Sequence, residues 1–466
     1  GGVPPGDPGG VVTPGPTPSP IDPAVPNPGD PTDPIDPGPG VSTGPRVYLV
    51  SADHADASDD NDGASLPFAT LQRGLDALSP GDTLLVDGAS EPYRQVDAID
   101  GRTVAGFVLS TSGTAEAPIT IIGSATRPVI DQGQTSASAG TPVLGLLLDC
   151  VSHVTVRNLE VRNVNDAGIS TSLTGCDTSG LRIEANHIHH VFGHDAVGAV
   201  RLANASQVSV GTNQIHDVYR TPGGPTTALV VGSPSSGIVV QNNSIREAEA
   251  GVTVRSAGQL IESADITGNR IADVDTGVYV TSDRGSGGAV QGVQVADNVM
   301  LRLARAFDAS VDVSGAVTGD ARVYNNTAVD VSDALVRTSG IDGLEVYNNV
   351  AVRLTGDALV TLAPRASAHA NSIVFHDHNV LWDSSGPNWT LDLGGPNAQR
   401  FSGFDGWRAA WSGSGHSDLM LDPDLSSRWA DPQFADEASE DYTTTNPALS
   451  GAGRNGGAVG ARRNSR

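Results

Sequence analysis

The chain has 466 residues and a formal net charge of −26, with 53 acidic side chains against 27 basic ones. Every basic residue is arginine, so a mechanism that needs a lysine base is excluded. The acidic balance argues against nucleic acid as a partner, because phosphate binding needs a basic surface. No apolar run approaches the length of about 18 residues that a transmembrane helix needs.

Residues 1–45 hold 15 of the 30 prolines, with Gly, Asp, Ser and Thr between them. Such a segment has too little apolar surface to build a core, so we expect a disordered, acidic, polyproline-like linker. Gly1 is preceded by neither Met nor an apolar leader, and we therefore expect that an export signal was removed or left out. The expected location is extracellular or at the cell surface.

Residues 46–150 are expected to form an N-terminal cap and the first coils of a repeat. The acidic turn at residues 58–63 suits either an Asx-rich turn or a calcium ion, which is the one cofactor that the sequence offers. A short amphipathic helix is expected from residue 65 onward, because Phe68, Leu71, Leu75 and Leu78 share one helical face. Such a helix would cover an exposed sheet edge.

Between residues 151 and 383 an asparagine returns every 23 to 30 residues, each time after a short apolar strand. The recurring positions are Asn158, Asn186, Asn213, Asn243, Asn269, Asn298, Asn326, Asn349 and Asn379. Strands at such a period, with no helix between them, predict a solenoid of the parallel β-helix type. The asparagines would stack as a ladder in the bends, because Asn tolerates the left-handed backbone of a sharp turn.

Cys150 and Cys176 lie 8 and 10 residues ahead of Asn158 and Asn186. These spacings place them in equivalent bends of neighbouring coils, within about 5 Å of each other. We therefore expect a disulfide, which an exported protein would retain. A buried pair of stacked thiols is the alternative.

Histidine is concentrated in one region, because five of the 11 histidines fall between positions 187 and 216. The ladder register stacks His189 on His216 and His190 on Asp217. Arg201 lies between two apolar residues that face inward and would point outward, as would Tyr279 about three coils further on. The candidate catalytic residues are His190, His194, Asp195, Arg201, His216, Tyr219 and Arg220, and the candidate carbohydrate-binding residues are Arg201 and Tyr279.

An outward groove of His, Tyr, Asp and Arg suits removal of the C5 proton of a uronate, with arginine neutralising the carboxylate. Three other interpretations stay open. The residues four places after each ladder asparagine read as a charged stripe that discourages aggregation. His187, His189 and His216 could bind a metal ion. Paired carboxylates for a hydrolase could come from Asp166, Asp195 and Asp217.

Residues 384–466 lose the repeat and are expected to form an irregular C-terminal cap and tail, with a short helix over residues 404–411. All five tryptophans lie after Asn379. They would either fill the core of the cap or stack on sugar rings.

The chain resembles the right-handed parallel β-helix proteins of the pectate-lyase-like superfamily over residues 46–460. The resemblance is carried by the segments Ser58–Gly63, Pro80–Thr83, Gly113–Thr120, Arg127–Asp131, Asp422-Pro423, Asp431–Phe434 and Asn446–Leu449. It implies an all-β solenoid with a short N-terminal capping helix and an irregular C-terminal cap. It identifies the fold better than the activity.

The superfamily includes polysaccharide lyases, glycoside hydrolases, uronate epimerases and non-catalytic adhesins or structural proteins. The resemblance therefore implies an exported protein that acts on a polysaccharide or cell-surface glycan, as a lyase or C5-epimerase of a uronate. The Asp-Pro-His signature of the epimerases is absent, and His194-Asp195 matches it only loosely. The alternative is a non-catalytic, surface-displayed protein with a structural, adhesive or self-assembling role.

Overall fold

The computed structural model describes residues 44–98, 104–136, 141–171, 175–193, 198–220, 226–282, 288–310, 320–339, 341, 343–355, 358–362, 373–384, 389–392, 399–401, 403–413 and 424–461. These ranges belong to one compact unit, which begins at Gly44. Residues 1–43 lie outside the described part of the chain. The expected linker over residues 1–45 therefore falls almost entirely outside the described residues.

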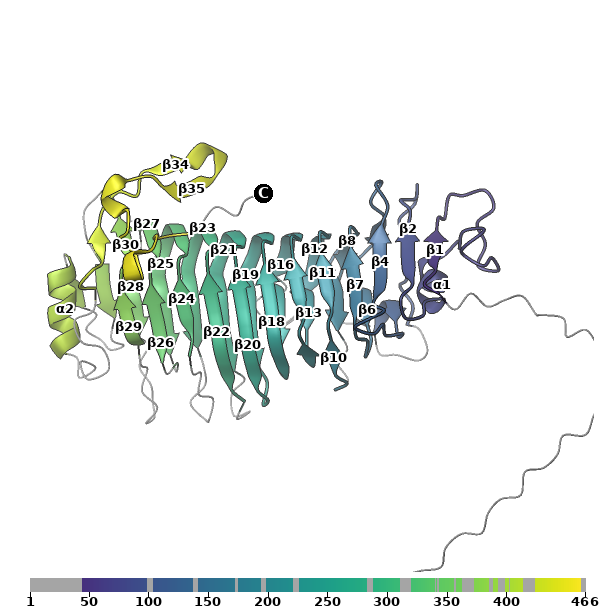
Figure 1. The fold of residues 1–466 in the computed structure, drawn as a ribbon, viewed down its shortest axis with the longest axis horizontal. Coiled ribbons are helices and arrows are strands. Elements are labelled where there is room, and N and C mark those ends of the chain that lie inside the picture. The colour runs from purple at the N-terminus through teal and green to yellow at the C-terminus, as the bar shows by residue number, and fades with distance from the viewer. Residues whose placement is uncertain are drawn as a thin grey trace, which may run out of the picture. The chain divides into compact units, whose positions relative to one another are not determined.

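The unit is a stack of coils, each of which adds strands to two long parallel sheets, sheet A and sheet B (Figure 1). Sheet A contains β1 (Val47–Val50), β2 (Thr83–Val86), β4 (Ile119–Gly123), β7 (Val154–Arg157), β10 (Thr178–Ser179), β11 (Arg182–Glu184), β14 (Ala205–Ser206), β15 (Ser209–Gly211), β18 (Ser235–Gln241), β20 (Ile261–Thr267), β22 (Val290–Ala296), β24 (Arg322–Tyr324), β26 (Leu344–Tyr347) and β29 (Ile373–Asp377).

Sheet B contains β3 (Ala105–Leu109), β5 (Val129–Asp131), β6 (Val143–Leu148), β8 (Glu160–Val164), β9 (Ile169–Thr171), β12 (His187–Gly193), β13 (Gly198–Leu202), β16 (Gln214–Arg220), β17 (Thr227–Gly232), β19 (Ser244–Ser256), β21 (Arg270–Ser282), β23 (Val299–Ser310), β25 (Thr327–Ser339), β27 (Val350–Leu354), β28 (Ala358–Leu362), β30 (Val380–Trp382), β31 (Trp389–Asp392), β32 (Gln399–Phe401) and β33 (Arg428–Trp429). Neighbouring strands come from successive coils and run parallel, except for the antiparallel pair β31 and β32, so the expected right-handed parallel β-helix is confirmed.

The core lies inside the coils, where alternate residues of each strand meet. In β18, for example, Ile238 and Val240 are buried whereas Val239 between them is half-buried on the outer face. This alternation follows from the two-residue period of a strand. It continues from coil to coil and joins the inward side chains into one apolar cluster that runs the length of the stack.

Asparagines do stack as a ladder, from Asn186 to Asn379. At Asn243, the backbone N–H and the amide Nδ2 both donate to Oδ1 of Asn269, each at 2.9 Å. The same Nδ2 also donates to the carbonyl of Val210 at 2.9 Å. Equivalent bonds join Asn186, Asn213, Asn243, Asn269, Asn298, Asn326, Asn349 and Asn379.

Asn158, however, is not a ladder residue. Arg157 pairs with Glu184, so Leu159 occupies the ladder position and donates its backbone N–H to Asn186 Oδ1 at 3.0 Å. Asn158 is the left-handed residue of its bend, with φ 58°. In later coils, too, the left-handed residue precedes the ladder asparagine, as at Ala185 (φ 55°) and Asn242 (φ 55°). The ladder therefore uses the paired donor and acceptor of the amide, and the reason expected from backbone preference was wrong.

Cys150 and Cys176 form a disulfide in the structure, with Cα atoms 5.4 Å apart. The bond joins bends of adjacent coils, as the spacing of the two cysteines predicted.

The N-terminal helix is α1 (Leu71–Asp76), which begins after the capping residue Thr70. It lies at the β1 end of the stack (Figure 1) and packs on β1, β2 and β3. The helix predicted from the sequence began too early in the chain, because Phe68 forms a β-bridge with Val50 and is not helical. The four apolar residues expected on one face are nevertheless all buried.

The C-terminal tail folds back over the outer face of sheet B (Figure 1). Helix α2 (Phe404–Gly413) matches the expected short helix, and its Trp407 is fully buried. Beyond it come β34 (Phe434–Asp436), η1 (Glu437–Ser439), β35 (Asp441–Thr444), η2 (Pro447–Leu449) and η3 (Arg454–Gly456). Tyr442, Leu449 and Val459 from the tail are buried against apolar side chains of sheet B. Trp407 thus fills the core, as the capping interpretation expects.

The ladder predicts a large loss of stability for Asn243→Ala. This change leaves the backbone N–H and amide of Asn213 without their acceptor, and each unsatisfied buried group costs about 1–3 kcal/mol. We expect a loss of about 3 kcal/mol, measured by urea denaturation and by hydrogen exchange of the flanking coils. The exposed neighbour Asn242, replaced by Gly to keep its left-handed backbone, is the matched control. Equal losses for the two variants would contradict the ladder's role.

The disulfide predicts a local effect of reduction. The two cysteines are 26 residues apart, so the chain-entropy model gives a stabilisation of about 3–4 kcal/mol. In a repeat protein this loss should fall on the coils around Cys150 and Cys176 more than on the distant ones. Hydrogen exchange with and without reductant measures it. Two thiols that alkylate freely in unreduced, exported protein would rule out the bond.

Candidate functional site

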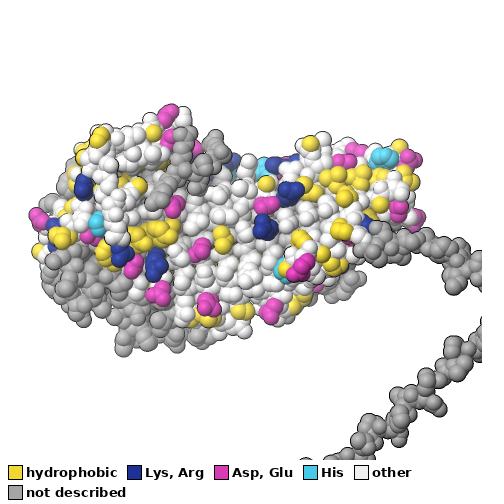
Figure 2. All heavy atoms as spheres, viewed as in Figure 1, with side chains coloured by type: hydrophobic (Ala, Val, Ile, Leu, Met, Phe, Trp, Pro, Cys, Tyr) yellow, Lys and Arg dark blue, Asp and Glu magenta, His cyan; other side chains and the backbone are white. Residues whose placement is uncertain are grey.

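The outer face of sheet B is polar in its N-terminal half and apolar in its C-terminal half. One column of stacked residues shows the change: it reads Arg162, His189, His216, Arg246, Ala272, Leu301, Val329 and Val352. The apolar residues of this column lie beneath the C-terminal tail. The polar residues stay uncovered, and Figure 2 shows histidine side chains at the upper edge, between the tail and the first coils.

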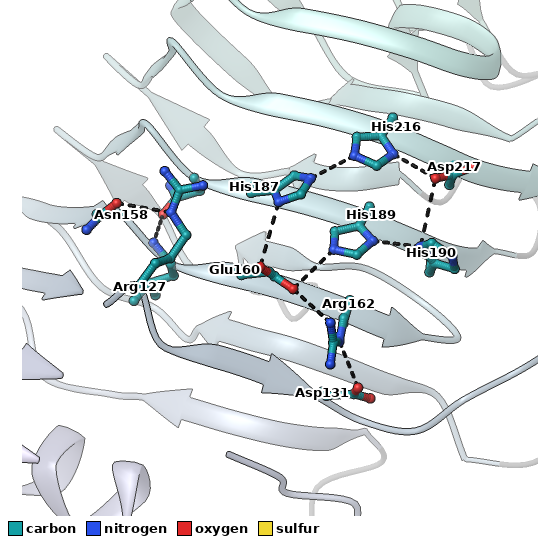
Figure 3. A network of polar contacts seen from close by, with 12 residues as sticks. Arg127, Asp131, Asn158, Glu160, Arg162, His187, His189, His190, His216 and Asp217 are labelled. Atoms are coloured by element: carbon teal, nitrogen blue, oxygen red, sulfur yellow. Dashed lines mark hydrogen bonds and ion pairs between the residues drawn. The ribbon is translucent and has the colours of Figure 1, made fainter. Parts of the chain in front are cut away.

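Four histidines lie together on β12 and β16 and form what we call the imidazole cluster: His187, His189, His190 and His216 (Figure 3). His187 Nε2 lies 2.7 Å from His216 Nε2, and His189 Nδ1 lies 2.6 Å from His190 Nδ1. The rings of His189 and His216 stack with centroids 5.1 Å apart, as the ladder register predicted.

Carboxylates lie at two ends of this cluster. Asp217 Oδ2 accepts a hydrogen bond from His216 Nδ1 at 2.7 Å and lies 3.9 Å from His190 Nδ1, which agrees with the expected stacking of His190 on Asp217. At the other end, Glu160 Oε1 is 3.4 Å from His189 Nε2, and Glu160 Oε2 is 3.8 Å from His187 Nδ1.

Arg162 orients Glu160 from the side away from the imidazoles. Its Nη1 donates to Glu160 Oε1 at 3.0 Å, and its Nε donates to Asp131 Oδ2 at 2.8 Å. Hydrogen bonds from Asn163 and Arg162 outweigh the effect of burial and lower the pKa of Asp131, so this partner of Arg162 stays ionised.

Burial sets the protonation of the inner histidines. Together with the neighbouring imidazoles of His189 and His216, it lowers the pKa of His187 to about 4. Burial also lowers the pKa of His189, although Glu160 opposes the shift. Both imidazoles are therefore neutral at pH 7, with one ring nitrogen of each carrying a lone pair.

Tyr219 and Phe192 form an aromatic surface beside the cluster. Their rings stack with centroids 5.1 Å apart, and Tyr219 is 39% exposed. The Tyr219 hydroxyl donates to Asp217 Oδ1 at 3.2 Å. Burial and the charge of Asp217 raise the pKa of Tyr219, so its hydroxyl keeps its proton at neutral pH.

Arg201 does not have the role expected from the sequence. It points out of the coil, but its guanidinium makes two hydrogen bonds to Asp166, at 3.0 and 2.8 Å, and a third to Ser170 Oγ at 3.0 Å. The Arg201 and Asp166 side chains are only 11% and 9% exposed. Asp166 neutralises Arg201, so neither side chain is available to a substrate, whether as a carboxylate ligand or as a hydrolase carboxylate.

The other predicted residues fall in three groups. His190, His216 and Tyr219 lie together in and beside the imidazole cluster. Tyr279 shares a column with Arg201, three strands away through Val230 and Thr253, which corresponds to about 14 Å. His194, Asp195 and the side chain of Arg220 lie outside the described residues.

The charged stripe has a structural basis. Most of its residues occupy a second left-handed position in their coils, as at Asp273 (φ 55°) and Arg302 (φ 54°), whereas Arg162 does not, because Asn163 (φ 53°) holds that position in its coil. Further along the stack they form ion pairs between coils, with Arg302 Nε 2.6 Å from Asp273 Oδ1 and Arg353 Nε 2.6 Å from Asp330 Oδ1. There the stripe is a set of mutually paired surface charges.

The acidic turn at residues 58–63 uses its carboxylates locally. Asp62 Oδ1 accepts backbone N–H bonds from Ala64 and Ser65, and Asp59 Oδ1 accepts them from Ala69 and Thr70. The bonds to Asp62 are those of an Asx turn, the alternative to a calcium ion that the sequence left open, whereas Asp59 binds backbone N–H groups 10 and 11 residues further along the chain.

Glu160 is a site residue that the sequence analysis missed. With Asn158 placed in the ladder, Glu160 counts as an inward residue, equivalent to Ile188. The observed register pairs Glu160 with His187 on the outer face. Leu159 could have revealed the correct register, because its apolar side chain occupies the ladder position in that coil.

A groove of about 750 Å³ follows the outer face of sheet A and is lined by side chains that include Thr155, Arg182 and Ser209. We place the candidate site at the imidazole cluster because titratable groups with shifted pKa values converge there, whereas the sheet A groove has no such convergence among its described residues.

No helix in the described part of the chain is long and apolar enough to cross a membrane. No family model and no curated protein matches the sequence. Similarity is found among solved structures. Pectate lyase Pel9A aligns with a TM-score of 0.53 and 17% identity, over 72% of this chain and 80% of that one.

Two more solved structures align less closely. The endo-xylogalacturonan hydrolase from Aspergillus tubingensis has a TM-score of 0.47 and 11% identity, over 69% of this chain and 96% of that one. The GH136 lacto-N-biosidase from Eubacterium ramulus has a TM-score of 0.46 and 17% identity, over 75% and 65%. This protein has the pectate-lyase-like parallel β-helix fold. Similarity at these identities establishes the fold and leaves the activity to the site.

The pairing of Arg201 with Asp166 predicts that Arg201→Ala acts on stability. Removing one partner of a buried ion pair leaves the other uncompensated, which costs about 3 kcal/mol. We expect a loss of that size in urea denaturation. The double variant Arg201→Met with Asp166→Leu should recover most of it, because no buried charge remains. Unchanged stability of Arg201→Ala would contradict the structural role of this ion pair, and Arg201 would again be a candidate for binding the substrate carboxylate.

Proposed function

We propose that the protein is an exported enzyme that acts on a uronate-containing polysaccharide by removing the proton from C5. The observation that carries the proposal is the group of imidazoles, carboxylates and a tyrosine on the outer face of sheet B, in which His190 and Tyr219 are exposed. Support also comes from the fold shared with pectate lyase Pel9A and from the disulfide, which is typical of exported proteins.

His190 is the best base in this arrangement. Its side chain is 42% exposed, against 22% for His187, 10% for His189 and 15% for His216. The Asp217 carboxylate, 3.9 Å from His190 Nδ1, would stabilise the imidazolium that forms when His190 takes a proton.

Tyr219 is the matching acid. Its ring centroid is 5.7 Å from that of His190, and its raised pKa keeps the hydroxyl protonated. In β-elimination, His190 takes the C5 proton, the electron pair of the C–H bond forms the C4–C5 double bond, and the C4–O bond breaks. Tyr219 then protonates the leaving oxygen. In epimerisation the same two groups would act from opposite faces of C5.

The substrate carboxylate needs a cation, and Arg201 does not supply it. Arg162 and Arg246 flank the histidines of the same column, and their side chains are 34% and 42% exposed. Arg246 pairs with Glu247 at the surface, a contact of about 0–1 kcal/mol that a bound carboxylate can replace. We assign carboxylate recognition to Arg246, and the stacked rings of Phe192 and Tyr219 offer a surface for the sugar.

A panel of uronic-acid polysaccharides tests the proposal. Elimination is followed by the ultraviolet absorbance of the new double bond, and epimerisation by exchange of the C5 proton with deuterium oxide. We expect His190→Gln and Tyr219→Phe each to lower kcat/KM by about 100-fold or more, as for loss of a general base or acid. Arg246→Gln should raise KM more than it lowers kcat.

The matched control is His54→Gln, because His54 lies in an exposed turn next to β1, away from sheet B. It should keep full activity. Wild-type protein that changes none of the glycans would contradict the proposal and favour a non-catalytic surface or self-assembling protein. Full activity in His190→Gln and Tyr219→Phe would show that the chemistry occurs elsewhere.

A further inference from the structure

Three possible metal ligands from neighbouring coils converge at the inner end of the imidazole cluster, beside His187 and His189. A carboxylate oxygen of Glu160 and ring nitrogens of His187 and His189 all lie within 4.8 Å of one another. The distances of 3.4 Å and 3.8 Å from Glu160 to the two imidazoles exceed the 2.7–3.2 Å of a typical N–H···O hydrogen bond. They are close to the separation of about 3.3 Å between ligand atoms in a tetrahedral zinc site.

The hydrogen-bond order fixes which nitrogen of His187 faces Glu160 as an acceptor. Asp217 accepts from His216 Nδ1–H at 2.7 Å, so a His216 that carries one ring proton has its lone pair on Nε2. His187 Nε2 then donates across the 2.7 Å contact to His216 Nε2. The Nδ1 atom of neutral His187 therefore carries no proton, and its lone pair points toward Glu160.

His189 is held in a similar way by His190. When His189 Nδ1–H donates across the 2.6 Å contact to His190 Nδ1, the Nε2 atom of His189 presents its lone pair to Glu160. Two lone pairs and an ionised carboxylate then face a common point. Such a group repels itself unless a cation lies among its members. In this tautomer His190 carries its proton on Nε2, so it acts as the base of the proposed reaction only when the bond runs the other way, from His190 Nδ1–H to His189 Nδ1.

We propose that Glu160, His187 Nδ1 and His189 Nε2 bind a divalent transition-metal ion of the zinc class. Imidazole nitrogens with one carboxylate suit zinc and its neighbours, whereas calcium and magnesium take oxygen ligands. Three protein ligands leave the fourth position of a tetrahedral ion open, as in catalytic zinc sites.

The surrounding residues have the arrangement that metal-binding histidines require. Each ligand imidazole is held through its other nitrogen, His187 by His216 and Asp217, and His189 by His190. Arg162 holds Glu160 through the 3.0 Å bond to Oε1. Partners of this kind fix the tautomer and the ring orientation, and their loss typically costs about 10–100-fold in metal affinity.

The metal site does not rest on the proposed function, because its residues and geometry are independent of any glycan.

Zinc binding to the full chain is the direct test, in the absence of any glycan. Protein freed of metal with a chelator is titrated with Zn²⁺ by calorimetry, and with Co²⁺ while the visible d–d absorption is recorded. We expect one ion per chain. Glu160→Gln, which keeps the size of the side chain, and His189→Gln should each weaken binding about 100-fold or more.

Asp217→Asn separates an organised site from a set of loose surface histidines. Asp217 does not touch the ion, so we expect an intermediate loss of about 10–100-fold. His153→Gln, on the other sheet beside Gly180, is the matched control and should bind as the wild type does. Circular dichroism confirms that each variant keeps its β structure.

Three results would overturn the proposal: no stoichiometric Zn²⁺ binding, equal affinity in wild type and Glu160→Gln, or a Co²⁺ spectrum unchanged by His189→Gln. These outcomes are distinct from a failure of the proposed function. Tight zinc binding by a protein inert toward every glycan supports the metal site and contradicts only the glycan reaction.

Discussion

Coil-to-coil hydrogen bonding in register is the constraint on which the rest of this molecule depends. Each ladder asparagine both accepts from and donates to its neighbours in the stack, so it holds one residue of each coil above the same residue of the next. A slip of one residue would turn every outward side chain inward. Because the register is fixed, residues almost 30 positions apart, such as Glu160 and His187, are held side by side about 4.8 Å apart along the stack.

The same register divides the outer face of sheet B into two parts. Columns that carry Glu160, His187 and His189 in early coils carry Val299, Leu301 and Val350 in later ones. The tail must cover the apolar part, and Tyr442, Leu449 and Val459 do so. Arg270 pairs with Glu440 of the tail and marks the border between the two parts. The position of the candidate site thus follows from where the apolar columns end.

Sequence reasoning succeeded where the repeat is regular and failed where one coil departs from it. Asn186 and Asn213 are true ladder residues 27 positions apart, so the stacking of His189 on His216 followed directly. At Asn158 the same reasoning was one residue out, because Leu159 takes the ladder position and hides Glu160 from the pattern. The partner of Arg201 could not be predicted either. Strand alternation gives the direction of a side chain, whereas Asp166 lies in a connection 35 residues earlier.

The imidazole cluster has an inner end and an outer end, and each end suits one of the two proposed roles. At its inner end the side chains of His187 and His189 are half-buried or nearly buried, and hydrogen bonds fix their ring nitrogens, which suits holding an ion in place. At its outer end His190 and Tyr219 are exposed and can meet a substrate. Asp217 contacts both ends, because it accepts from His216 and from Tyr219. Its carboxylate therefore orients the imidazole of His216 at the inner end and, together with burial, raises the pKa of Tyr219 at the outer end.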